Sequence, residues 1–139
     1  MKNVFTALLL LLSLSVLAQS PDADKILGTY NTDGHKGKVV ITKQGNQFSG
    51  TLVWTHIPDA KDIKNPDPTK RNNQVAGTVI LKNFVYADNS TWEKGTVYDP
   101  ESGKTYSGKI TLKGDGNLSL RGYVGIPAFG RTTLWERVH

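Results

Sequence analysis

The clearest pattern in the chain is an alternation of small or apolar residues with polar residues between positions 105 and 112. This period of two predicts a β-strand with one solvated face. The segment Asp99-Pro100-Glu101-Ser102-Gly103 has the composition of a hairpin turn, because Pro fixes φ early in a turn and Gly tolerates a positive φ. The preceding strand is therefore expected from Trp92 to Tyr98.

Similar short segments, separated by Gly, Asn, Asp and Pro, continue through the rest of the chain. They predict further strands over residues 26–32, 38–42, 48–57, 75–81, 118–124 and 131–138. No segment has a sustained apolar period of 3.6 residues. About eight antiparallel strands predict an all-β meander. We favour a closed barrel over a sandwich, because closure removes both sheet edges and glycines recur inside the strands.

A polar segment of about 16 residues, 58–73, interrupts this pattern and contains three prolines. Loops longer than roughly 12–15 residues are usually functional or disordered. The segment could form a lid over a barrel mouth, or it could be a solvated excursion without a task, and the sequence leaves both interpretations open.

The first residues have the pattern of a signal peptide. Lys2 precedes an apolar run of about 14 residues that ends in Val16-Leu17-Ala18, which is too short for the ~20 residues of a membrane span. We expect residues 1–18 to be cleaved, leaving residues 19–139 as one periplasmic or secreted domain without a transmembrane span. The chain has 0 Cys, which excludes disulfides and a lipid-modified cysteine.

The charge and the histidines limit the function classes. The net charge of +5 becomes +4 without Lys2, and the cations are scattered rather than clustered, so we expect no nucleic-acid partner. His35, His56 and His139 are too isolated to form a local zinc motif, and we expect no metal, no cofactor and a monomer. No Gly-x-Ser-x-Gly motif is present, so a hydrolytic enzyme is the interpretation with the least support.

Several residues together resemble the bacterial exported family catalogued as domain of unknown function 2147. They are Trp92, Gly95, Tyr98-Asp99-Pro100, Gly103, Tyr106, Leu120-Arg121-Gly122-Tyr123, Gly125, Gly130-Arg131 and Trp135-Glu136-Arg137, with Asn65-Pro66 and Gly77 before them. The resemblance implies a small lipocalin-type barrel. It also implies that Gly28-Thr29-Tyr30 stands where a Gly-x-Trp would open the first strand, and that Arg137 stacks over the ring of Tyr30 and seals the barrel base.

Other residues are candidates for binding a ligand. Phe48, Gly50, Leu52 and Trp54 share a strand face, and extending this face places His56 at the barrel mouth. An inward arginine beside a tyrosine hydroxyl could hold an anionic headgroup, although alternation favours Arg121 and Tyr123 facing water. The full candidate set is Trp54, His56, Trp92, Tyr98, Tyr106, Arg121, Tyr123 and Arg131.

Two functions from different classes remain open. The protein could carry or sense a small amphipathic, anionic or lipid-like molecule inside the barrel, or it could be a filled barrel that binds another envelope protein. Inward Gly50, Gly108 and Gly122 favour a cavity, whereas Phe48, Trp54 and Tyr106 favour filling. We favour the ligand-binding interpretation slightly.

Overall fold

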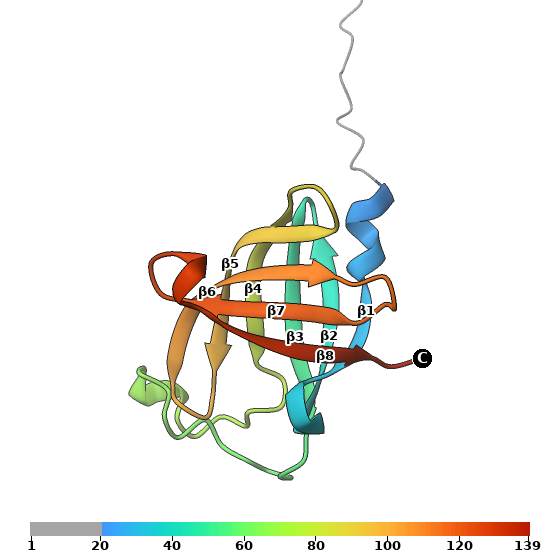
Figure 1. The fold of residues 1–139 in the computed structure, drawn as a ribbon. Helices are drawn as coiled ribbons and strands as arrows, with labels where there is room; N and C mark the ends of the chain where they lie inside the picture. The colour runs from blue at the N-terminus through green and yellow to red at the C-terminus, as the bar shows by residue number, and fades with distance from the viewer. Residues whose placement is uncertain (1–20) are drawn as a thin grey trace, which may run out of the picture.

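The computed structural model describes residues 21–139, in which eight antiparallel strands pair in sequence order and close into a barrel (Figure 1). The strands are β1 (Gly28–Asn31), β2 (Gly37–Gln44), β3 (Gln47–Thr55), β4 (Val79–Tyr86), β5 (Thr91–Asp99), β6 (Lys104–Leu112), β7 (Leu118–Tyr123) and β8 (Arg131–Arg137). Four 3-10 helices accompany them: η1 (Pro21–Ile26), η2 (Asp33–His35), η3 (Pro68–Lys70) and η4 (Pro127–Phe129). The predicted all-β meander barrel is confirmed. The expected signal peptide lies outside the described residues.

The predicted strands agree with the structure to within two residues at each end, except at β4. Ile26 ends η1 instead of beginning β1. β4 runs from Val79 to Tyr86 instead of over residues 75–81, because the backbone N–H of Val75 donates to Ala60 O inside the long connection at 2.8 Å. As a result the sequence interpretation left Phe84, a fully buried residue, outside any strand.

One end of the barrel is sealed by Arg137. Its guanidinium carbon lies 4.8 Å from the ring centroid of Tyr30, the distance of a cation–π contact. The guanidinium also donates to the carbonyls of Lys25, Leu27 and Gly116 at 2.7, 3.1 and 3.1 Å. This contact ties η1 to the barrel, and η1 lies at the opposite end from the long β3–β4 connection (Figure 1).

Tyr30 is held at the same end by its own hydrogen bond. Its hydroxyl donates to Ile26 O at 2.8 Å, and burial raises the pKa of this hydroxyl although the charge of Arg137 opposes the shift. A side chain at Gly28 would collide with the Arg137 guanidinium, since a built Cβ lies 2.7 Å from Nη1. Gly28 therefore permits the close approach of the cation that seals this end.

The barrel half next to this seal is filled with large apolar side chains. The ring of Trp92 meets Phe48 and Tyr86 edge-on, with centroids 6.3 and 5.1 Å apart. Phe84 lies where side chains at Gly95 and Gly108 would otherwise be, because a Cβ built at either position overlaps its ring. The expectation that inward Gly50 and Gly108 leave space for a ligand is therefore wrong: Phe84 fills the space at Gly108, and Leu81 and Val39 fill it at Gly50.

A β-bulge in β3 reverses the predicted orientation of Trp54. Leu52 pairs with Val39 and Trp54 pairs with Lys38, which leaves Val53 as an extra residue on β3. Val53 and Trp54 are both exposed, at 49% and 45%, and Lys38 Nζ lies 5.6 Å from the Trp54 ring centroid. The expectation that Trp54 continues the inward face of Leu52 is therefore wrong.

Candidate functional site

The other half of the barrel holds a cavity of about 770 Å³. It opens among four connections, residues 32–36, 56–78, 100–103 and 124–130, which all contribute to its lining. Its apolar wall is formed by Leu52, Val75, Ile80, Val97 and Leu120. Its volume is within the ~300–1,000 Å³ of typical small-molecule sites.

Strand β8 runs from the cavity mouth to the sealed end. Its inward positions are Arg131, Thr133, Trp135 and Arg137, which alternate along the strand. Arg131, Thr133 and Trp135 line the cavity, whereas Arg137 stacks on Tyr30. Trp135, which is only 5% exposed, therefore separates the cavity from the seal and forms part of the cavity floor.

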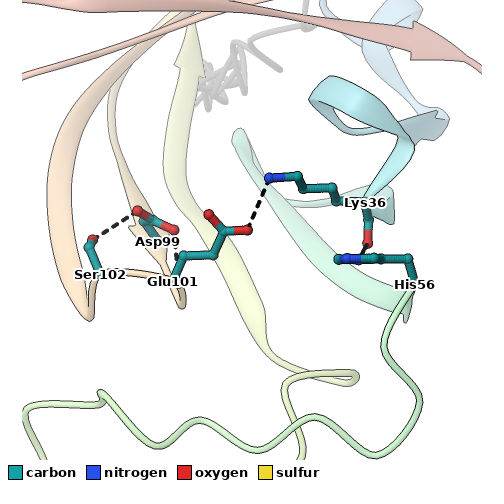
Figure 2. A network of polar contacts seen from close by, with 5 residues as sticks. All are labelled: Lys36, His56, Asp99, Glu101 and Ser102. Atoms are coloured by element: carbon teal, nitrogen blue, oxygen red, sulfur yellow. Dashed lines mark hydrogen bonds and ion pairs between the residues drawn. The ribbon is translucent and has the colours of Figure 1, made fainter.

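Polar side chains surround the mouth (Figure 2). Lys36 Nζ reaches Glu101 Oε1 at 3.5 Å, linking the β1–β2 connection to the β5–β6 turn. His56 Nδ1 lies 3.0 Å from Lys36 O, and because a carbonyl oxygen only accepts, Nδ1 carries the hydrogen and Nε2 is not used in this bond. The Lys36–Glu101 pair is solvent-exposed, so its contribution to stability is about 0–1 kcal/mol.

The long β3–β4 connection is fixed to the barrel by a buried carboxylate. Asp62 is 3% exposed, and its carboxylate accepts from the Tyr98 hydroxyl at 2.5 Å and from Asn65 Nδ2 at 2.8 Å. Burial and the hydrogen bond to Asp62 raise the pKa of Tyr98 well above its ordinary range. The connection is thereby held over the barrel end, where Ala60 and Lys61 line the cavity.

The backbone of this connection is also ordered. Asp62 N–H donates to Asn73 O at 2.9 Å, which together with the Val75–Ala60 bond pairs its two ends. Gly103, with φ of +72°, packs directly against the Lys64 carbonyl and leaves no room for a side chain. The sequence left open whether the segment covers the mouth. In the structure it forms part of the cavity wall.

The cavity brings together some of the predicted ligand-binding residues. His56, Tyr98, Tyr106, Tyr123 and Arg131 line it. From the predicted signature set, Asp99, Pro100, Gly122 and Trp135 also line it, whereas Gly28, Tyr30 and Arg137 form the sealed end and Gly103 packs against the long connection.

Three of the predicted residues lie elsewhere. Trp54 is on the outer surface, as described above. Trp92 is fully buried in the filled half, and its Nε1 has no hydrogen-bond partner within residues 21–139. Arg121 is on the outside, where it donates to Pro127 O at 2.6 Å and to Thr132 Oγ1 at 2.7 Å and so supports the β7–β8 connection.

Sequence reasoning missed several cavity residues. Ile80 lies in β4 and within the predicted strand over residues 75–81, but it was not among the predicted ligand-binding residues. Val97 turns inward only because the β5 register shifts between Trp92 and Gly95, where Lys94 adopts a φ of +64°. Strict alternation from Trp92 would have placed Val97 on the opposite face, and no local signal in the sequence marks the shift.

Within residues 21–139, His, Asp and Glu side chains form no group of three or more that could hold a metal ion. In the same part of the chain, no helix has the length and apolar character needed to cross a membrane.

An antiparallel eight-stranded meander that is sealed at one end and hollow at the other is a lipocalin-like barrel. The model of the family described as "Uncharacterized protein conserved in bacteria (DUF2147)" matches residues 28–137, and the chain belongs to this family. Among solved structures it is similar to protein HP1028 from the human pathogen Helicobacter pylori, which is described as belonging to the lipocalin family. The TM-score is 0.76, with 23% identity over 82% of this chain and 83% of that chain. No curated protein sequence matches.

Proposed function

We propose that the protein binds a small amphipathic molecule, with the apolar part inside the barrel and the polar part at the mouth. The observation that carries this proposal is the cavity of about 770 Å³, which has an apolar wall and floor and a polar rim. The side chains at its base, including Leu120 and Trp135, suit a hydrocarbon tail or ring. Lys36, His56, Glu101 and Arg131 at the rim suit a polar head.

The expected affinity follows from the hydrophobic effect. Burying nine methylene groups of a ten-carbon tail gains about 7 kcal/mol at about 0.8 kcal/mol each. Loss of translational and rotational freedom offsets at least about 4 kcal/mol of this gain. The remainder of about 3 kcal/mol corresponds to a dissociation constant in the millimolar range. A tail alone is therefore held weakly, and tight retention needs a contact at the rim.

The place of action is part of the same proposal. Residues 1–18 have the composition of a signal peptide, so the protein would meet its ligand in the periplasm or outside the cell. The proposed ligand-binding form is a monomer, as expected from the sequence. A barrel that encloses an apolar tail can carry a poorly soluble molecule through water, which suits this location.

The proposal is tested with N-phenyl-1-naphthylamine, a neutral probe whose fluorescence rises in apolar surroundings. The full chain, processed during export, should increase the probe's fluorescence and saturate. Gly122→Leu should reduce the affinity at least about tenfold, because position 122 faces the cavity and a Cβ there meets Tyr106 at an ordinary 3.6 Å. Trp54→Ala, on the outer surface, is the matched control and should bind as wild type does.

Two further outcomes decide the proposal. Native mass spectrometry of the gently purified protein should show a bound species that is lost on denaturation. A wild-type chain that binds neither the probe nor any envelope lipid would overturn the proposal. It would leave the alternative expected from the sequence, a module that binds another envelope protein.

A further inference from the structure

Arg131 is placed to reach into the cavity from the first position of β8. It pairs with Gly122 on β7, and directly paired residues of antiparallel strands have their side chains on the same face. Gly122 faces the cavity beside Tyr106, whose Cβ lies 3.6 Å from a Cβ built at position 122. Because Gly122 has no side chain, the space next to Arg131 on this face is left to the guanidinium and to the Tyr106 ring.

The other charges at the mouth are already engaged or lie elsewhere. Lys36 pairs with Glu101 at 3.5 Å, and Lys61 Nζ donates to Asn72 at 2.8 Å. The Asp99 carboxylate accepts from the Glu101 backbone N–H at 3.0 Å and from Ser102 Oγ at 2.8 Å. Within residues 21–139, Arg131 is the one cation lining the cavity whose side chain has no hydrogen bond or ion pair.

Asp33, an acidic residue that also lines the cavity, forms no ion pair with Arg131. It belongs to η2, which packs beside Glu136 through a 3.3 Å contact from His35. Glu136 lies five residues beyond Arg131 on β8, a separation of about 17 Å at about 3.3 Å per residue. Within residues 21–139, neither Asp33 nor Glu136 forms an ion pair with Arg131.

We propose that Arg131, together with the Tyr106 hydroxyl, binds the anionic head of the amphipathic molecule, either a carboxylate or a phosphate monoester. This inference rests on the proposed function. A guanidinium presents its N–H groups as a planar fork that matches the two oxygens of such a head. The Tyr106 hydroxyl, which has no partner among the described residues, supplies a further donor. The tail then extends toward Trp135 at the cavity floor.

The test compares ten-carbon molecules that differ only in the head. Decanoate, decyl phosphate and decan-1-ol are titrated against the bound naphthylamine probe at low ionic strength. In wild type, both anions should displace the probe at concentrations at least about tenfold lower than the alcohol does. Arg131→Gln should remove this preference and leave the affinity for the neutral probe unchanged. Arg131→Lys, which keeps the charge but loses the fork, should fall between the two.

Lys82→Gln is the matched control, since it removes the same charge from an exposed position on β4 outside the cavity lining. It should retain the wild-type preference. A preference for anions that persists in Arg131→Gln overturns the proposed headgroup site. The same conclusion follows if all three decyl compounds displace the probe equally well from wild type. Inorganic phosphate competing as well as decyl phosphate would indicate a site for the free anion and would also overturn it. Failure of wild type to bind the probe and all three decyl compounds overturns the proposed function itself.

Discussion

Glycines face inward in both halves of the barrel, but the space beside them is filled in one half and open in the other. In the filled half, Gly95 and Gly108 lack side chains because Phe84 occupies the space that they would need. In the hollow half, Gly122 faces the cavity and a Cβ there meets only ordinary contacts. An inward glycine therefore does not by itself indicate room for a ligand. The side chain that reaches across from another strand decides whether the space is filled or open.

Removing the Phe84 side chain, which fills the space beside Gly95 and Gly108, should have the largest effect on stability. Phe84 is fully buried, so Phe84→Ala should lower the free energy of unfolding by about 3–5 kcal/mol, measured by urea denaturation. Binding of the neutral probe should change little, because Phe84 does not line the cavity. A large loss of probe affinity in a still-folded variant would show that the two halves are not independent.

A second substitution sharpens this result. In the double variant Phe84→Ala with Gly95→Ala, the new methyl group enters space that the ring has vacated. The combined loss of stability should therefore be smaller than the sum of the two single losses. Strictly additive losses would contradict the assignment of Gly95 as the residue that accommodates Phe84.

The two glycines can be compared directly with the same substitution. Gly95→Ala should cost about 1–3 kcal/mol of stability, because the added methyl overlaps the Phe84 ring. Gly122→Ala should change stability by no more than about 0.5 kcal/mol, since its Cβ has room. Thermal and urea unfolding of both variants measure the difference, and equal costs would remove the distinction between the filled and hollow halves.

The smallest expected effect concerns the anchor of the β3–β4 connection. Burial and Asp62 raise the folded-state pKa of Tyr98 above its ordinary value of 10.0. The stabilisation is therefore complete below about pH 10 and is lost as the pH rises toward the folded-state pKa, because the unfolded tyrosine ionises first. Urea unfolding between pH 8 and 11 should show this loss in wild type and a shallower loss in Tyr98→Phe.

At neutral pH the same variant should cost about 1 kcal/mol, because it leaves the buried Asp62 carboxylate with one hydrogen bond fewer. Tyr106→Phe is the control, since its hydroxyl has no hydrogen-bond partner within residues 21–139, and it should be close to neutral for stability. An equal cost for both variants would argue that the Tyr98–Asp62 contact does not hold the connection.

The sequence was sufficient for the meander, because alternation and turn composition are local properties. It was not sufficient to predict which residues of each strand face the barrel interior along its whole length. The extra residue at Val53 and the positive φ of Asn83 and Lys94 interrupt β3, β4 and β5 where the sheet must bend. Closure of the whole barrel determines these positions. The alternation therefore placed Trp54 on the wrong face and did not identify Val97 as an inward residue.

The long connection shows a different limit of sequence reasoning. Its composition indicated a loop but did not indicate whether the loop was fixed. The contact that fixes it joins Asp62 to Tyr98, which are 36 residues apart. Asp62 resembles the turn-forming aspartates near it in sequence, and only its burial in the folded chain distinguishes it. By contrast, Arg131 and Tyr106 could be identified early because both lie on regular strands.

The seam between the first and last strands also has a consequence for how the chain folds. β1 pairs with β8 only at Tyr30–Arg137 and Asn31–Glu136, whereas every other ladder joins strands that are neighbours in sequence. These ladders join strands that are close in sequence, apart from β3 and β4 with their long connection, and so form at a lower entropic cost. The seam must bring together the two ends of the sheet. We therefore expect the pairing of β1 with β8, which closes the barrel, to be the last step in folding. The cation–π contact between Arg137 and Tyr30 stabilises this closure. Weakening the Arg137–Tyr30 contact would therefore accelerate unfolding far more than it would slow folding.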